Sequence, residues 1–464
     1  MELKYVDTKP KVSGRGVTSD QSKPDRYNFL TTAAELLKAS LTRYTKAMMF
    51  TIFVGTCSIS WANDNTSSVH GQVGDVEYSL IEGPSGVSRQ LDEEEEAYDD
   101  KPDMNTFPAL SDWKNQVKED HGLSFGAYAM LLYQYADETL PGNEHDAAGT
   151  VLWFHGDWTA YEREDGHFGL IQWRLEKRSA IAGLQAPSDL KNAIGLAVPN
   201  PATGYIDTFN TDISVLNWSH GYKNRASIAV GRLAYNAHLD SFFIGTFFRA
   251  FLNSAIRYNP TVASTGIGAL AVVAKGFVTD NILIGAHVYD ANAVSGAFDM
   301  DTFKQHEWLT AFEIAWTPSI ASYKIDRIQF TYWHQDERQE AGVVEGQGWA
   351  VSASHQLTDD LIPFLRFGHS NGGAGVAAES SASIGFEYMP REYHAWSFGA
   401  AWAKPSEKTH GTDLEDEYAF ETSYRFQLSR HFSIMPDAQL MLNPAKNPSV
   451  DSSWVLGLRL LLTL

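Results

Sequence analysis

The chain has 464 residues, a formal charge of −21 at pH 7 and one cysteine, and 44% of its residues are hydrophobic. A negative charge of this size argues against a general nucleic-acid binder, because nothing in it offsets the repulsion by phosphate. No apolar run of about 18 residues occurs apart from the neighbourhood of 48–61, which argues against a helical membrane protein. The length suits several ordinary domains or one large barrel with additional segments.

The first apolar stretch has the organisation of a secretory signal. Arg43 and Lys46 precede an apolar run over residues 48–58, and small residues at Ser60 and Ala62 suit signal peptidase. We therefore expect residues 41–62 to be a signal peptide that is cut after Ala62.

The position of this signal predicts that residues 1–40 are an extension ahead of the true translation start. Cys57 then lies in the removed segment, so that the mature chain needs no disulfides. A lipobox at "VGTC" is the alternative, although Thr56 is unfavourable before a lipidated cysteine.

Residues 63–109 are polar and acidic. Within them "LDEEEEAYDDKPD" (91–103) has few apolar residues, which favours a solvated, disordered linker. A calcium-binding or partner-binding tail is the alternative. Residues 110–121 predict a short amphipathic helix, and we find no glycine-rich phosphate loop or His/Cys metal spacing, so no cofactor or metal is expected.

After Gly122 the chain consists of repeated segments in which apolar and polar residues alternate. In the last one, even positions from Trp454 to Leu464 are apolar, whereas Arg459 lies on the opposite face, which we expect to meet water. Eleven residues approximate the about 9 to 11 that a tilted strand needs to cross a bilayer. The same alternation recurs in residues 168–178, 327–335, 381–388, 393–402 and 417–428.

A soluble sandwich explains any single strand equally well, because it also buries one face. The export signal, the aromatic residues near segment ends and a count of roughly 16 segments favour a closed membrane barrel. The predicted fold is all-β: a transmembrane antiparallel barrel over residues 122–464, preceded by the short helix and the acidic segment.

Three stretches resemble the OprB-type carbohydrate-selective porins of Gram-negative outer membranes. They are "AVGRLAYNAHLDSFFIGTFFRAFLNSAIRYNPTV", "PFLRFGHSNGG" and the ending that contains Pro436, Asp437, Gln439, Asn443, Pro444, Asn447 and Pro448. The resemblance covers most of the chain from Leu110 and implies a barrel of 16 strands that admits sugars by diffusion. The acidic segment is outside the family core, and Leu464 stands where an aromatic residue is usual.

The candidate constriction lies on residues 168–178. Arg174, Glu176 and Arg178 leave one face of the strand and form a positive, negative, positive ladder that offers donors and acceptors to sugar hydroxyls. The preceding strand adds Trp153 and Asp157. The resemblance places Glu176, Arg178, Arg232, Asp240 and Asn253 in recurrent motifs, and Arg366 is a further candidate. For each of these residues the alternative is a charge in a wall network without substrate contact.

The sequence therefore predicts a passive outer-membrane channel with sugars as permeants and lipid around it, and leaves a homotrimer open. A general-diffusion porin is one alternative. An outer-membrane enzyme would need a catalytic dyad such as Ser219 and His220, but adjacent strand residues point to opposite faces. A receptor with an internal plug is disfavoured, because the polar residues from Asn63 are few and acidic.

Overall fold

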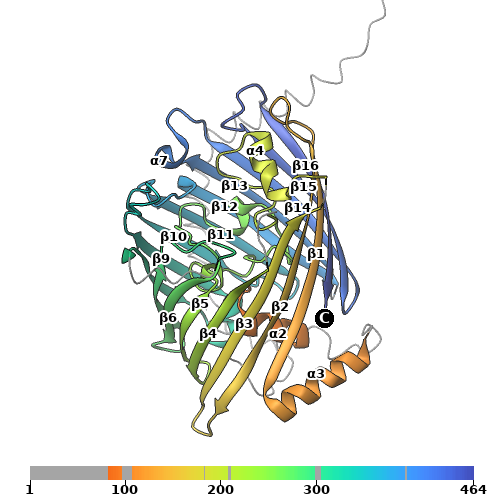
Figure 1. Cartoon of the computed structure of the whole chain (residues 1–464), viewed down its shortest axis with the longest axis vertical. Helices are drawn as coiled ribbons and strands as arrows, with labels where there is room; N and C mark the ends of the chain where they lie inside the picture. Colours follow the sequence, from red (N-terminus) through yellow and green to blue (C-terminus); the bar gives the residue numbers. More distant parts are fainter. Residues whose placement is uncertain (1–81, 97–106, 182, 207–210, 298–304, 392–393) are drawn as a thin grey trace, which may run out of the picture. The chain divides into compact units, whose positions relative to one another are not determined.

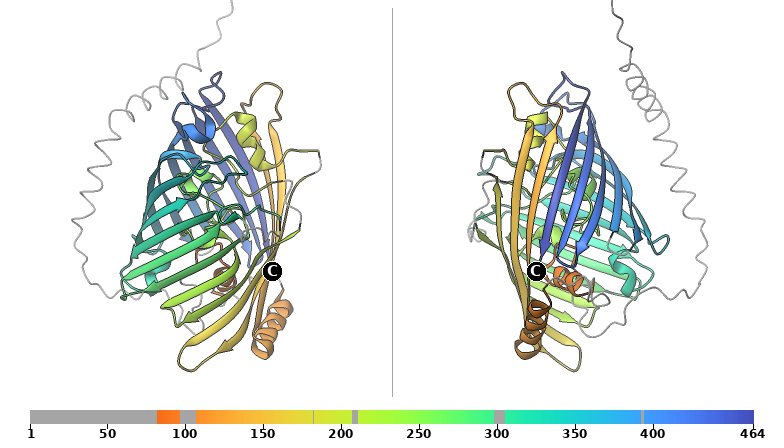
Figure 2. Two further views of the ribbon diagram at one scale, coloured as in Figure 1. Left: turned by 60° about the vertical axis from the view of Figure 1, so that its left-hand side comes forward. Right: turned by 90° about the vertical axis from the view of Figure 1, so that its right-hand side faces the viewer.

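Sixteen antiparallel strands follow one another around a barrel, which closes where β1 pairs with β16 (Figures 1 and 2). The computed structural model describes residues 82–96, 107–181, 183–206, 211–297, 305–391 and 394–464. The predicted extension and signal peptide, with Cys57, lie outside these residues, as do residues 63–81 and 97–106 of the predicted linker.

The strands have the following bounds: β1 Leu123–Ala136, β2 Asp146–Glu162, β3 His167–Ala180, β4 Asp212–Tyr222, β5 Ala226–Leu233, β6 Ala269–Phe277, β7 Ile282–Asp290, β8 Trp308–Trp316, β9 Arg327–Gln335, β10 Gly346–Ser354, β11 Leu361–Ser370, β12 Ala378–Arg391, β13 His394–Pro405, β14 Glu417–Ser429, β15 Phe432–Leu442 and β16 Ser452–Thr463. The all-β barrel and its strand number are as the sequence predicts.

The helices are short and lie before or between the strands. They are α2 Val87–Glu96, α3 Pro108–His121, α4 Leu190–Ile194, α5 Ser254–Arg257 and α7 Glu407–His410, with 3-10 turns η3 Pro187–Asp189, η4 Tyr235–Ala237 and η5 Ala321–Lys324. Within the described ranges, no helix combines the length and the apolar character that a membrane crossing requires.

The alternation assigns the two faces of the strands correctly. In β16, Trp454, Leu456 and Leu458 are exposed on the outside, whereas Val455 and Arg459 are buried inside. A charged side chain on the inner face avoids the cost of contact with lipid. The expectation that Arg459 meets water is wrong, because a loop inside the barrel covers it completely.

The two ends of the barrel differ in their connections. At one end the turns 163–166, 223–225, 278–281 and 430–431 are short, and α3 and the end of β16 lie at this short-turn end. At the other end, the connections β3–β4, β5–β6 and β7–β8 are long. We refer to the two as the short-turn end and the long-loop end.

The prediction of an unstructured linker over 63–109 is wrong for residues 82–96, where the chain forms α2 against β1, β2 and β3 (Figure 1). The acidic composition that favours disorder begins at Leu91, whereas the residues that dock precede it. Val87, Ser88 and Gln90 are almost fully buried by the barrel. Burial against strands that come later in the sequence has no signal in the local composition.

Candidate pore constriction

Two long loops fold back into the barrel and fill much of its interior. The β3–β4 loop (183–206) carries η3 and α4, and the β5–β6 loop (234–268) carries η4 and α5. Their apolar side chains form one cluster with inward residues of the wall. That cluster includes Leu190, Ile194, Phe242, Phe251, Ile256, Phe364, Met441 and Val455. The loops are therefore part of the hydrophobic core and occupy space inside the barrel.

Carboxylates on the inner wall hold both loops by their backbone. Glu417, Glu421 and Glu313 are each at most 1% exposed and accept hydrogen bonds from loop N–H groups. The bonds are Ala197 N and Val198 N to Glu417 (2.8 and 2.6 Å), Leu252 N and Asn253 N to Glu421 (2.6 and 2.9 Å), and Asp240 N to Glu313 (2.6 Å). Five backbone N–H groups of the loops thus have partners on the wall, and these contacts hold the loops in place.

Arginines on the wall hold the β5–β6 loop by its carbonyl groups. Arg459 donates to the carbonyl oxygens of Phe247 and Ala250. Arg366 donates to the carbonyl oxygen of Arg257 at 2.7 Å. Each arginine therefore crosses the space between a strand and the loop.

Arg366 also forms a salt bridge of 2.5 Å with Asp240, which has a left-handed backbone with φ of 46°. Burial raises the pKa of Asp240, and the neighbouring guanidinium opposes that rise. Both side chains are almost completely buried. Asp240 and Arg366 are thus a loop anchor.

The ladder predicted from the sequence is present on β3. Glu176 Oε1 lies 2.5 Å from Arg178 Nη2, and Glu176 Oε2 lies 3.5 Å from Arg174 Nε. Trp153 on β2 packs under Arg174, whose guanidinium carbon is 4.2 Å from the ring centroid. The four side chains thus combine charge-assisted hydrogen-bonding groups with an aromatic face.

The ladder is covered rather than open. Arg174, Glu176 and Arg178 are 2%, 1% and 5% exposed. The ring of Phe247 from the β5–β6 loop lies 5.8 Å from the Arg178 guanidinium, and Gly204 of the β3–β4 loop approaches the same group. A Cβ at Gly204, where φ is +105°, would lie 3.4 Å from Arg178 Nη1, so the loop passes close over the ladder.

The remaining predicted residues form their hydrogen bonds and ion pairs with residues outside the ladder. Arg232 pairs with Asp212 at 3.0 Å and donates to the carbonyl oxygen of Ala297 at 2.8 Å. Asn253 caps α5 and donates to Gln439 at 3.0 Å. Asp157 accepts a hydrogen bond from Ser88, a residue of the N-terminal segment.

Several luminal residues were not predicted as site residues. Arg257 is fully buried, stacks 4.5 Å from the ring centroid of Tyr258, and has an Nε and an Nη1 without a hydrogen-bond partner among the described residues. Lys275 and His287 bracket Glu313 at 2.8 and 3.0 Å. The inward parity of Glu313 and Lys275 on their strands could have marked them, whereas nothing in the sequence marks Arg257, which sits on a loop.

Similarity to known proteins decides the family. The profile described as "Carbohydrate-selective porin, OprB family" matches residues 191–464. The chain belongs to this family. It is also similar to the porin AaxA of Chlamydia abortus, with 23% identity over 283 residues, which are 58% of this chain and 60% of that relative. The chain thus aligns with less than two thirds of that protein.

The fold of this OprB-family barrel is shared with a solved structure. The high-pH structure of Pseudomonas putida OprB superimposes with a TM-score of 0.61 at 13% identity and covers 76% of this chain and 97% of that one. The family consists of outer-membrane porins of Gram-negative bacteria, which are channels and not enzymes. In agreement with the strand geometry, Ser219 is buried on the inner face, whereas His220 bonds Tyr161 on the outer face.

Membership of the family also orients the barrel. Outer-membrane barrels have short periplasmic turns and longer extracellular loops. The short-turn end, where α3 and the end of β16 lie, is therefore the periplasmic end. Among the residues that the structure describes, no group of three His, Cys, Asp or Glu side chains is placed to hold a metal ion.

Proposed function

We propose that this barrel is a passive, sugar-preferring diffusion channel whose selective step takes place at the Arg174, Glu176 and Arg178 ladder. The observation that carries the proposal is the combination of alternating charges with Trp153 on one inner face. Side chains at i, i+2 and i+4 of a strand span roughly 13 Å, which is comparable to a short sugar chain.

Neutral sugars suit such a surface for two reasons. Their hydroxyl groups both donate and accept, so that they exchange partners along the ladder without meeting an uncompensated charge. The apolar face of a pyranose ring packs against an aromatic side chain such as Trp153. A small ion gains neither contact and faces charges of both signs.

The test compares variants in planar bilayers and in liposome swelling. Arg178→Ala and Glu176→Ala should raise salt conductance and weaken block of the current by added sugar, because each removes hydrogen-bonding groups from the proposed selective surface. Arg225→Ala is the matched control, since Arg225 is 44% exposed and pairs with Asp280 at a periplasmic turn. Unchanged sugar block in both ladder variants would place selectivity elsewhere.

A general-diffusion porin is the second candidate, since the wall carries charges of both signs beyond the ladder. It predicts that swelling rates follow solute size alone. Sugars that enter faster than non-sugar solutes of equal size would exclude it.

We also propose that outer-membrane lipid contacts the exposed aromatic and aliphatic side chains of the strands, such as Trp218, Phe312 and Trp396. A homotrimer remains a prediction, for which the mass of the detergent-solubilised protein by light scattering is the measurement.

A further inference from the structure

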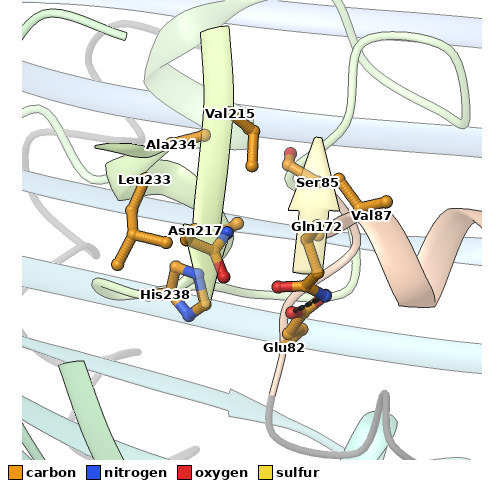
Figure 3. Close-up of a pocket in the computed structure, with 11 residues that line it drawn as sticks. Glu82, Ser85, Val87, Gln172, Val215, Asn217, Leu233, Ala234 and His238 are labelled. Carbon is orange, nitrogen blue, oxygen red and sulfur yellow. Dashed lines mark hydrogen bonds between the residues drawn. The ribbon is translucent and has the colours of Figure 1, made fainter. Parts of the chain in front are cut away.

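The lumen holds a third element besides the two loops. Residues 82–92, which we call the plug segment, enter the barrel between the β5–β6 loop and strands β2 and β3 (Figure 3). Ser85, Val87 and Ser88 are 3%, 2% and 3% exposed, and Gln90 is fully buried. The segment precedes the region matched by the family profile, residues 191–464.

The plug segment occupies polar groups on the inner face of β2 and β3. Gln172 Nε2 donates to Glu82 Oε1 at 2.7 Å and to Ser88 Oγ at 2.8 Å. Ser88 Oγ in turn donates to Asp157 Oδ2 at 2.9 Å. The side chains of Gln172 and Glu82 meet directly in Figure 3.

The same segment reaches the ladder. Arg174 Nη1 donates to the carbonyl oxygen of Ser85 at 3.3 Å. Gln172 and Arg174 are neighbours on one face of β3, and Gln172 is the nearer of the two to the periplasmic turn. The segment therefore covers the periplasmic half of the surface on which the proposed sugar contacts lie.

A close backbone approach seats the segment against the β5–β6 loop. Gly83 N donates to the carbonyl oxygen of Ala237 at 2.6 Å, and a Cβ at Gly83 would lie 2.4 Å from Ser241 Cβ. Val87 packs in a small cluster with Val215, Ala234 and Ala237. The contacts are complementary in shape, and the cavity left beside them is only about 10 Å³. Even one water molecule barely fits in such a space.

The docked state is nevertheless incompletely bonded. Both polar atoms of the Gln90 amide and Oε2 of Glu82 are buried without a hydrogen-bond partner among the described residues. Water would satisfy these groups if the segment left the barrel, so part of the docking energy is offset by their desolvation. A segment that is docked inside the barrel with unsatisfied polar groups is suited to reversible docking.

We propose that residues 82–92 are a tethered plug, which closes the periplasmic half of the channel when docked and opens it when it leaves. The proposal takes from the proposed function only that the barrel conducts solutes. It concerns access to the channel and holds for ions as well as for sugars.

The first experiment locks the segment in place. Ser85 Oγ lies 3.5 Å from Asn236 Nδ2, and neither side chain belongs to the ladder. The full-length variant Ser85→Cys/Asn236→Cys should conduct several-fold less after oxidation than after reduction, and the single-cysteine variants should not respond. A disulfide that forms, as judged by loss of thiol labelling, with equal conductance in both states overturns the proposal.

The second experiment releases the segment and does not depend on a disulfide. Val87→Asp buries a carboxylate in an apolar cluster, which should expel the segment and raise salt conductance several-fold. Val278→Asp is the matched control, because Val278 is 59% exposed at the β6–β7 turn. Heat-modifiable migration on a gel verifies that both barrels have assembled, and equal conductance of assembled Val87→Asp and wild type refutes the plug.

The two proposals fail separately. Salt conductance reports the plug, whereas the ratio of swelling rates for sugars and non-sugar solutes in Val87→Asp reports selectivity. A Val87→Asp channel that opens but does not prefer sugars supports the plug and contradicts the sugar-preferring function.

Discussion

The conductance of the wild-type channel should depend on pH through Glu82. Burial is the main reason why the pKa of this carboxyl rises from 4.5 to about 7 in the docked segment. The charges of Asp157 on β2 and Asp92 on α2 raise it further, whereas the hydrogen bond from Gln172 on β3 and a backbone bond at Arg89 lower it. The docked state thus favours the protonated form.

The sign and size of the effect follow from this difference in pKa. Below about pH 4.5 the carboxyl is neutral whether the segment is docked or released, and docking is strongest. As pH rises from 4.5 to about 7, only the released form loses its proton, and docking weakens by about 3 kcal/mol in total. Above that range the effect is complete. Such a change shifts the ratio of docked to released segment by roughly 300-fold.

Planar-bilayer recording between pH 4 and 8, values that bracket the window, measures this effect. We expect the open probability of wild type to rise with pH, and Glu82→Gln to remain closed with a much flatter profile, because the neutral amide keeps the bond from Gln172. A Glu82→Gln channel with the same pH profile as wild type would show that another group controls opening. Arg225→Ala, at an exposed turn, again serves as the control.

Other predictions concern the wall, the seat of the plug segment and export. Leu460→Arg should impair assembly, since a charge on the lipid face costs about 2–4 kcal/mol near the midplane. Arg459→Leu should instead leave an assembled barrel with a noisy current, because two loop carbonyl groups lose their hydrogen-bond donor. Gel migration measures assembly, and single-channel recording measures the noise of the current. Gly83→Ala should open the channel by contact with Ser241, and Gly83→Ala/Ser241→Gly should close it again. Mass spectrometry of outer-membrane material should find the mature chain beginning at Asn63, and a peptide from further upstream would contradict the predicted cleavage.

The number of strands and the direction in which their side chains point could be predicted from the sequence, because both depend on a local pattern. A strand that separates lipid from an interior must alternate, so that the inward direction of Arg174, Glu176 and Arg459 follows from parity alone. The ladder was predicted for the same reason, since its three members share one strand.

The loop anchors could not be predicted in this way, because their partners are far apart in the chain. Arg366 and Asp240 are 126 positions apart, and Asn253 meets Glu421 across 168 positions. The family resemblance selected Asp240 and Asn253 without showing what they do. The partners come close together only after the barrel has closed. The residue pattern along one strand does not show which distant residues closure brings together.

The sequence did not predict the docking of the plug segment, because its acidic composition predicts a solvated chain, whereas several of its side chains are buried. The acidic run from Leu91 is typical of a solvated chain. The residues that contact the barrel lie just before it: Gly83 allows a close backbone approach, Val87 packs in an apolar cluster, and the Ser88 hydroxyl forms a hydrogen bond. The argument that a plug needs more residues holds for an independently folded domain. It does not hold for a short segment, because the folded barrel supplies the hydrophobic and polar contacts that the segment needs.

Chain connectivity separates the roles of the three luminal elements. The β3–β4 and β5–β6 loops are joined to strands at both ends and are held by buried carboxylates such as Glu417 and Glu421, so that withdrawing them would also disturb the wall. The chain continues from the plug segment to α3 and β1, and among the described residues every strand of the barrel follows it in the sequence. It can therefore leave without breaking a single strand pair. Because α3 keeps it next to the periplasmic mouth, its effective concentration there stays high, which makes return fast and reversible closure physically reasonable.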